Sequence, residues 1–168
     1  MVESIQFSIP SLASDVGQWL LARNSSLVTV ESCTGGGIAY AITSVSGSSE
    51  WFDRGLVTYS NQAKNELAAV PLSLIQEHGA VSIEVAESMA IGGLTNSNAD
   101  IAVSVTGIAG PDGGNREKPV GTVCFAWAKK TDRHFNIEIS QCCLFDGDRE
   151  GIRKQSISHA LWTIMELK

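Results

Sequence analysis

The chain has 168 residues and a mass of 17.9 kDa. Of these residues, 43% are hydrophobic and 18% are charged. This length suits a single domain with its own core, and the composition excludes a disordered chain. The net charge is −6 and the pI about 5.0, which disfavours a general nucleic-acid binder. No run of 18 apolar residues and no signal peptide occurs, so we expect a cytoplasmic protein without membrane contact.

The cysteines and histidines do not form a recognisable metal motif. The four cysteines are Cys33, Cys124, Cys142 and Cys143, and no C-x-x-C spacing occurs among them. The histidines are scattered, and none stands in an H-E-x-x-H motif. We therefore expect four reduced thiols and no metal.

Apolar spacing predicts alternating helices and strands in the first part of the chain. The predicted helices cover residues 11–23, 38–42, 60–69, a short segment from Pro71 to His78, and 82–95. The predicted strands cover residues 27–30 and 55–59. Between them, Trp51 and Phe52 fall in a predicted loop, where we expect a subunit contact of a homo-oligomer.

The second part of the chain is richer in strands. Residues 100–105 (DIAVSV) are mostly apolar, which is typical of a strand buried on both faces. A polar loop over 106–119 follows, then two strands over 120–128 and 135–144 and a final helix over 148–166. Together these elements predict one domain over residues 1–168, with a core of about 11–166. The expected fold is a three-layer α/β/α sandwich with a mixed central sheet.

The segment 31–37 (ESCTGGG) places a tight glycine turn between a strand and a helix. Such a turn exposes backbone N–H groups that favour a phosphate or the oxyanion of a tetrahedral intermediate. Ser32 stands at the mouth of the turn, where its hydroxyl could attack a carbonyl. The segment is not a Walker loop, a dinucleotide fingerprint or a G-x-S-x-G motif. Catalysis, anion binding and a purely structural turn all remain open from this pattern.

Six blocks of sequence together resemble one known family. They are residues 31–36 (ESCTGG), 57–61 (VTYSN) with Lys64, 78–82 (HGAVS), 104–114 (SVTGIAGPDGG), 118–123 (KPVGTV) and 145–149 (FDGDR). In this order they resemble the CinA carboxy-terminal domain family over about residues 11–166, in its stand-alone form. Characterised members of that family are nicotinamide-nucleotide amidases.

The resemblance implies a reaction and three residues that carry it. Family members hydrolyse the carboxamide of nicotinamide mononucleotide to nicotinic acid mononucleotide and ammonia, in pyridine-nucleotide salvage. They use a serine nucleophile and a lysine, with neither a metal nor another cofactor. Ser32 matches the serine, Lys64 the lysine, and Tyr59 a tyrosine near the same site.

The chemistry requires an unusual lysine at position 64. Amide hydrolysis by a hydroxyl needs a base for its proton and an acid for the departing ammonia. A neutral lysine amine serves both purposes, but its pKa must then fall from about 10.4 to about 7. Burial and a cationic neighbour, such as the pyridinium ring of the substrate, both lower it. Without the resemblance, Lys64 would be interpreted as a solvated helix residue.

Two further groups of residues are expected to bind the substrate. The N–H groups of Thr34, Gly35 and Gly36 are the predicted oxyanion hole. Thr106, Gly107 and Gly110 follow a buried strand, where ligands bind in open α/β sheets. Arg149 would pair with the substrate phosphate.

Three other functions remain open: a non-catalytic nucleotide-binding module, a hydrolase of another amide or phosphoester, and an accessory to DNA uptake. The acidic pI argues against direct DNA contact in the last.

Overall fold

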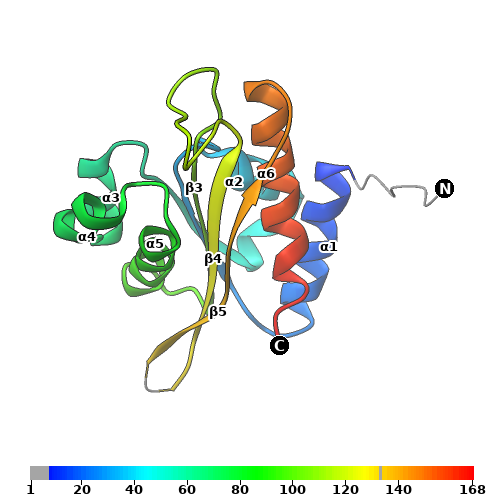
Figure 1. The fold of residues 1–168 in the computed structure, drawn as a ribbon. Coiled ribbons are helices and arrows are strands. Elements are labelled where there is room, and N and C mark those ends of the chain that lie inside the picture. The colour runs from blue at the N-terminus through cyan, green and yellow to red at the C-terminus, as the bar shows by residue number, and fades with distance from the viewer. Residues whose placement is uncertain (1–7, 133) are drawn as a thin grey trace.

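The computed structural model describes residues 8–132 and 134–168 (Figure 1). Its elements, in chain order, are α1 (Ile9–Leu21), β1 (Leu27–Glu31), α2 (Gly37–Thr43), the 3-10 turn η1 (Ser48–Glu50), β2 (Phe52–Val57), α3 (Asn61–Ala68), α4 (Leu72–His78), α5 (Ile83–Thr95), β3 (Ile101–Gly107), β4 (Thr122–Lys130), β5 (Phe135–Leu144) and α6 (Arg149–Ile164). Side-chain oxygens of Ser8, Ser60, Ser82 and Asp148 cap four of the helices.

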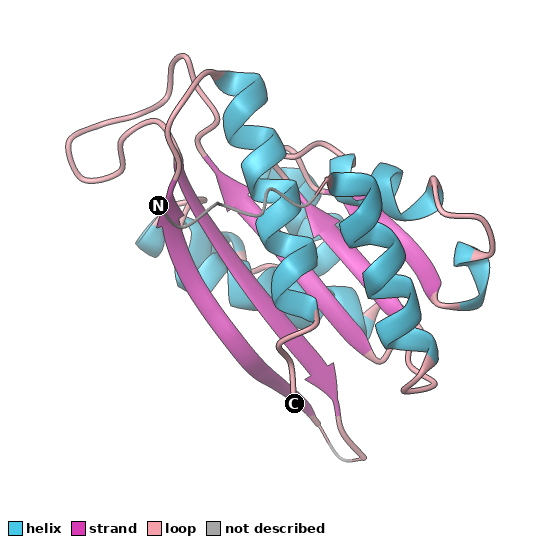
Figure 2. Ribbon diagram, turned by 90° about the vertical axis from the view of Figure 1, so that its right-hand side faces the viewer, coloured by secondary structure: helices cyan, strands magenta, loops and turns pink. Residues whose placement is uncertain are grey.

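The five strands form one sheet in the order β2-β1-β3-β4-β5, with helices on both faces. Helices α1 and α6 cross one face, as Figure 2 shows, and α2 packs with them. Helices α3, α4 and α5 cover the other face, where α5 packs on β1, β3 and β4. The predicted three-layer α/β/α sandwich with a mixed sheet is therefore confirmed. Among the described helices, none is both long and apolar enough to cross a membrane.

The direction of the strands determines where a site can form. Strands β2, β1 and β3 run parallel, whereas β4 and β5 are antiparallel to their neighbours. The chain leaves β1 toward β2 on one side and later returns to β3 on the other side. This reversal opens a crevice at the carboxyl end of β1, which is where open α/β sheets bind ligands.

Strand β2 starts earlier than the sequence predicts, and this corrects two expectations. Phe52 opens the strand instead of lying in a loop, and Tyr59 lies in the loop after it. Trp51 is only 2% exposed, and its indole ring packs so closely on α1 that a Cβ at Gly17 would lie 2.7 Å from it. Trp51 is a core residue, so its ring is not available for the subunit contact that the sequence predicts at this position.

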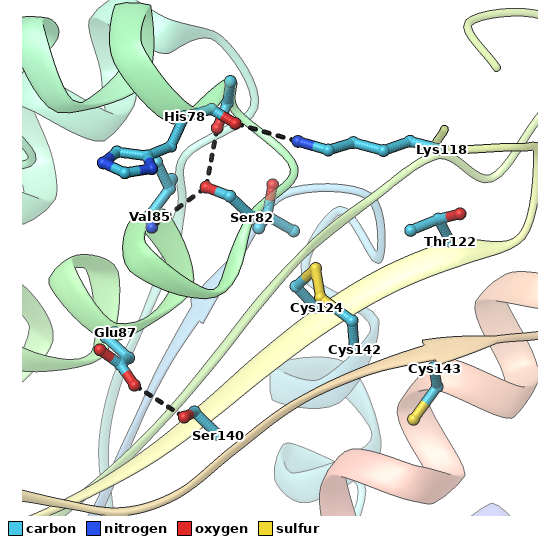
Figure 3. Close-up of a disulfide and its surroundings, with 12 residues drawn as sticks. His78, Ser82, Val85, Glu87, Lys118, Thr122, Cys124, Ser140, Cys142 and Cys143 are labelled. Carbon is cyan, nitrogen blue, oxygen red and sulfur yellow. Dashed lines mark hydrogen bonds between the residues drawn. A yellow bond between two sulfur atoms is a disulfide. The ribbon is translucent and has the colours of Figure 1, made fainter. Parts of the chain in front are cut away.

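The expectation of four reduced thiols was also wrong. Cys124 on β4 and Cys142 on β5 are register partners with Cα atoms 4.0 Å apart, and a disulfide joins them (Figure 3). Cys33 and Cys143 are free. The pairing follows from the β4–β5 hairpin, whose register brings together two positions that are 18 residues apart in sequence.

Candidate active site

Ser32 directly follows β1 and lies at the crevice between β1 and β3. Its backbone N–H donates to the carbonyl of Val105 (2.9 Å), and its own carbonyl accepts from the N–H of Gly35 (3.0 Å). Gly35 and Gly36 have φ values of 60° and 89°, in the left-handed region that glycine tolerates. The chain therefore reverses its direction within four residues, and Ser32 lines a pocket.

The carboxylate of Glu31 holds this turn in place through hydrogen bonds. It is fully buried and accepts four hydrogen bonds: from Thr29 Oγ1 (3.2 Å), Thr34 Oγ1 (2.7 Å), the Ile38 N–H (3.0 Å) and the Ala39 N–H (2.8 Å). The last two are the N–H groups at the start of α2, which favour an anion. This helix terminus therefore holds a carboxylate of the protein itself.

Lys64 comes from α3, on the opposite side of the sheet from α2. Its side chain is 1% exposed, and its Nζ donates to Ser32 Oγ (3.1 Å) and to the Thr58 carbonyl (3.0 Å). Helix α3 packs close to α5, which allows Lys64 to reach Ser32, because Gly92 on α5 has no side chain. A Cβ at Gly92 would lie 1.7 Å from the carbonyl oxygen of Ala68.

The electrostatics of this buried cluster favour a neutral amine beside a hydroxyl. Burial lowers the pKa of Lys64 below its ordinary value, and the neighbouring Cys33 opposes this only in part. Within the described residues, Lys64 forms no salt bridge. Burial also raises the pKa of the Cys33 thiol to about 11, so this thiol stays protonated at neutral pH. Lys64 Nζ therefore contacts a hydroxyl, that of Ser32, beside a thiol that stays protonated.

A pocket of about 190 Å³ opens beside Ser32 and Lys64. The predicted residues that line it are Ser32, Tyr59, Lys64, Thr106, Gly107 and Arg149. Tyr59 is 61% exposed, and its hydroxyl oxygen accepts from Arg149 Nη2 (3.1 Å) instead of contacting Ser32 or Lys64. Thr106 Oγ1 donates to the Ala80 carbonyl (2.7 Å), which holds another wall of the pocket.

The other predicted residues support the pocket without lining it. Thr34 turns its hydroxyl to Glu31, and the Gly35 N–H is bonded to Ser32. Within the described chain, no hydrogen bond uses the N–H of Thr34 or Gly36. The carbonyl of Gly110 accepts from Arg149 Nη1 (2.7 Å), so this glycine helps to place the arginine.

The sequence does not predict Glu31 and Thr58 as part of this site, and it does not predict five residues that line the pocket: Cys33, Asn61, Ala80, Val81 and Ala109. Glu31 is predicted only as the first residue of the glycine turn, although an acidic residue just before a glycine turn and a helix can reach that helix's N-terminus. The Thr58 carbonyl leaves no signal in the sequence. In residues 8–132 and 134–168, no three His, Cys, Asp or Glu side chains lie close enough together to hold a metal ion.

Comparison with known proteins identifies the family of this chain. The CinA C-terminal domain family matches residues 9–168. The chain belongs to this family. It is 51% identical over 155 residues to nicotinamide-nucleotide amidohydrolase PncC of Escherichia coli K12, covering 92% of each chain. The Pseudomonas putida protein of the same name is 49% identical over 159 residues, covering 95% of this chain and 96% of that one.

A solved structure matches the fold as well. The crystal structure of competence/damage inducible protein CihA from Agrobacterium tumefaciens superposes with a TM-score of 0.88 at 40% identity. The match covers 94% of each chain. The crystal structure of the competence-damaged protein (CinA) superfamily protein from Klebsiella pneumoniae 700603 matches with the same TM-score of 0.88 at 35% identity, so the fold is that of the CinA superfamily.

Proposed function

We propose that this protein is a nicotinamide-nucleotide amidohydrolase that converts nicotinamide mononucleotide and water to nicotinic acid mononucleotide and ammonia. The observation that carries the proposal is the contact between Lys64 Nζ and Ser32 Oγ in a pocket wall. The chain is 51% and 49% identical to two proteins named nicotinamide-nucleotide amidohydrolase, and this similarity supports a nicotinamide nucleotide as the substrate.

In the proposed mechanism, neutral Lys64 accepts the hydroxyl proton as Ser32 Oγ bonds to the carboxamide carbon. The resulting tetrahedral intermediate collapses when the C–N bond breaks, and the lysine ammonium returns its proton to the departing ammonia. Water then attacks the acyl-serine with Lys64 again as base, which releases the carboxylate and restores the hydroxyl. The N–H groups of Thr34 and Gly36, which no group of the described chain accepts from, are the proposed donors to the oxyanion, which would lie over the turn at the edge of the pocket.

The size of the pocket suits one end of the substrate. A volume of about 190 Å³ is smaller than a typical site of about 300–1,000 Å³ for a whole ligand. We infer that the pyridine ring and carboxamide enter it, while ribose and phosphate extend over Tyr59 and Arg149. Among the described residues, the Arg149 guanidinium donates only to neutral acceptors, a carbonyl and a phenol, so its charge is available to a phosphate.

The test is to incubate the purified protein with nicotinamide mononucleotide and to quantify both products. The proposal predicts equimolar ammonia and nicotinic acid mononucleotide, with much slower turnover of nicotinamide riboside, which lacks the phosphate. A protein that binds the nucleotide without releasing ammonia is the binding module considered above, and the proposal then fails.

A further inference from the structure

Helix α6 carries a ridge of three side chains along the loops of the site. Arg149, Arg153 and Ile157 follow one another at intervals of four residues, so they share one face of the helix. Arg149 reaches the pocket, as described above. Ile157 packs against the start of α2, where a Cβ at Gly37 would lie 2.6 Å from it. Arg153 lies between them and faces the turn that carries Ser32.

Arg153 is a partly buried cation without an acidic partner. Its Nη2 donates to the Thr34 carbonyl (2.9 Å), and its Nε is buried without a hydrogen-bond partner. Among the residues that the structure describes, no carboxylate lies within salt-bridge distance of it. Desolvating a guanidinium is costly unless charge and hydrogen bonds compensate for it. A contribution to stability therefore does not explain its position.

The residue that Arg153 contacts is held from two sides. Thr34 donates its hydroxyl to Glu31 (2.7 Å), and its carbonyl accepts from the Gly37 N–H (3.1 Å) as well as from Arg153. The next peptide N–H, that of Gly35, donates to the Ser32 carbonyl. The orientation of the Thr34–Gly35 peptide is therefore coupled directly to the backbone of the nucleophile.

We propose that Arg153 is a positioning residue that holds the Ser32 turn through the Thr34 carbonyl and keeps Ser32 Oγ within reach of Lys64. Its kinetic consequences rest on the proposed amidohydrolase function, whereas its effect on the turn does not. Arg153 acts on the geometry of the nucleophile, whereas Arg149, one helical turn earlier on the same face, lines the substrate pocket. The two arginines thus have separable roles.

The kinetic test compares Arg153→Met, Arg153→Lys and the neighbouring control Lys154→Met by ammonia release. Lys154 is exposed and pairs with Glu150 on the same helix, so its loss leaves the turn untouched. We expect Arg153→Met to lower kcat about 10- to 100-fold with KM within about threefold of wild type. Arg153→Lys should recover part of kcat, because an ammonium still donates to the Thr34 carbonyl. Unchanged kcat in Arg153→Met overturns the proposal, and so does a raised KM with normal kcat, which indicates a substrate contact.

A second measurement needs no substrate and separates the two proposals. Amide exchange of Gly35 and Gly37, read by NMR, reports the two hydrogen bonds of the turn. We expect at least about tenfold faster exchange in Arg153→Met, with β3 amides unchanged as a control for folding. If this occurs in a protein that releases no ammonia, the proposed function fails and the positioning role stands. Unchanged exchange at both glycines overturns the positioning role whatever the activity. Should Arg153→Met not fold, the same comparison with Arg153→Lys decides, with a smaller acceleration expected.

Discussion

Lys64 Nζ lies 3.1 Å from Ser32 Oγ, although Lys64 belongs to α3 on one face of the sheet and Ser32 to the turn that leads from β1 into α2 on the other face. Two close approaches produce this contact: the turn at Gly35 and Gly36, and the packing of α3 on α5 at Gly92. The lysine is buried without a carboxylate partner among the described residues, which favours its neutral form. A hydroxyl beside a neutral amine provides a nucleophile and a base for attack on an amide.

Burial of Lys64 makes the stability of the fold depend on pH. Its pKa is lower in the folded than in the unfolded chain, where it is about 10.5, so between these values the unfolded chain binds the extra proton. The cost of burying the charge is thus present in full below the lowered pKa and disappears as pH rises toward 10.5. We expect the free energy of unfolding of wild type, relative to Lys64→Met, to increase with pH across this window. Urea denaturation of both proteins at several pH values measures the slope, and a flat difference would contradict a lowered pKa.

Glu31→Gln should destabilise the protein although the two side chains have nearly the same shape. The carboxylate accepts from four donors, and an amide would turn its NH₂ group toward some of them. We expect a loss of about 2 kcal/mol in the free energy of unfolding, or a decrease of about 4–8 °C in Tm. Glu50→Gln, an exposed change on the 3-10 turn, is the control. Equal melting temperatures for the two variants would exclude the anchoring role of Glu31.

Gly92→Ala tests the close approach of α3 to α5. In an open helix this change would stabilise by about 1 kcal/mol through helix propensity. Here the new Cβ would meet the Ala68 carbonyl at 1.7 Å, so we expect a loss of at least about 1–3 kcal/mol and reduced activity, because α3 carries Lys64. Ser88→Ala on the same helix should be nearly neutral. Chemical denaturation gives both values, and a stabilised Gly92→Ala protein would show that α3 lies elsewhere.

The Cys124–Cys142 disulfide predicts a specific thiol count. Unfolded without reductant, the chain should expose two reactive thiols, from Cys33 and Cys143, and four after reduction. Closing a loop over a sequence separation of 18 stabilises by about 3 kcal/mol. Cys142→Ser should therefore lower the free energy of unfolding far more than the adjacent Cys143→Ser. Four thiols in the unreduced protein would show that the bond is absent.

The layers could be predicted because the pattern of apolar residues indicates which faces of an element are buried. In the strand at residues 101–105, for example, nearly every residue is apolar, which indicates burial on both faces. It predicted Ser32 at the mouth of a turn, but its residues alone did not connect Ser32 with Lys64. That contact depends on α3 crossing to the other face of the sheet, and only the family resemblance suggested it. Glu31 was missed because two of its four donors are backbone N–H groups of α2 and the other two are threonine hydroxyls, and this combination has no established sequence motif. The disulfide was missed because hairpin register, and not spacing, brings its cysteines together.

The rate of ammonia release from nicotinamide mononucleotide by Ser32→Ala, beside wild type, tests the central claim most directly. Loss of the attacking oxygen should lower kcat by at least about 1,000-fold while the melting temperature stays close to that of wild type. If Ser32→Ala releases ammonia at the wild-type rate, another group attacks the amide and the account of Ser32 and Lys64 is wrong.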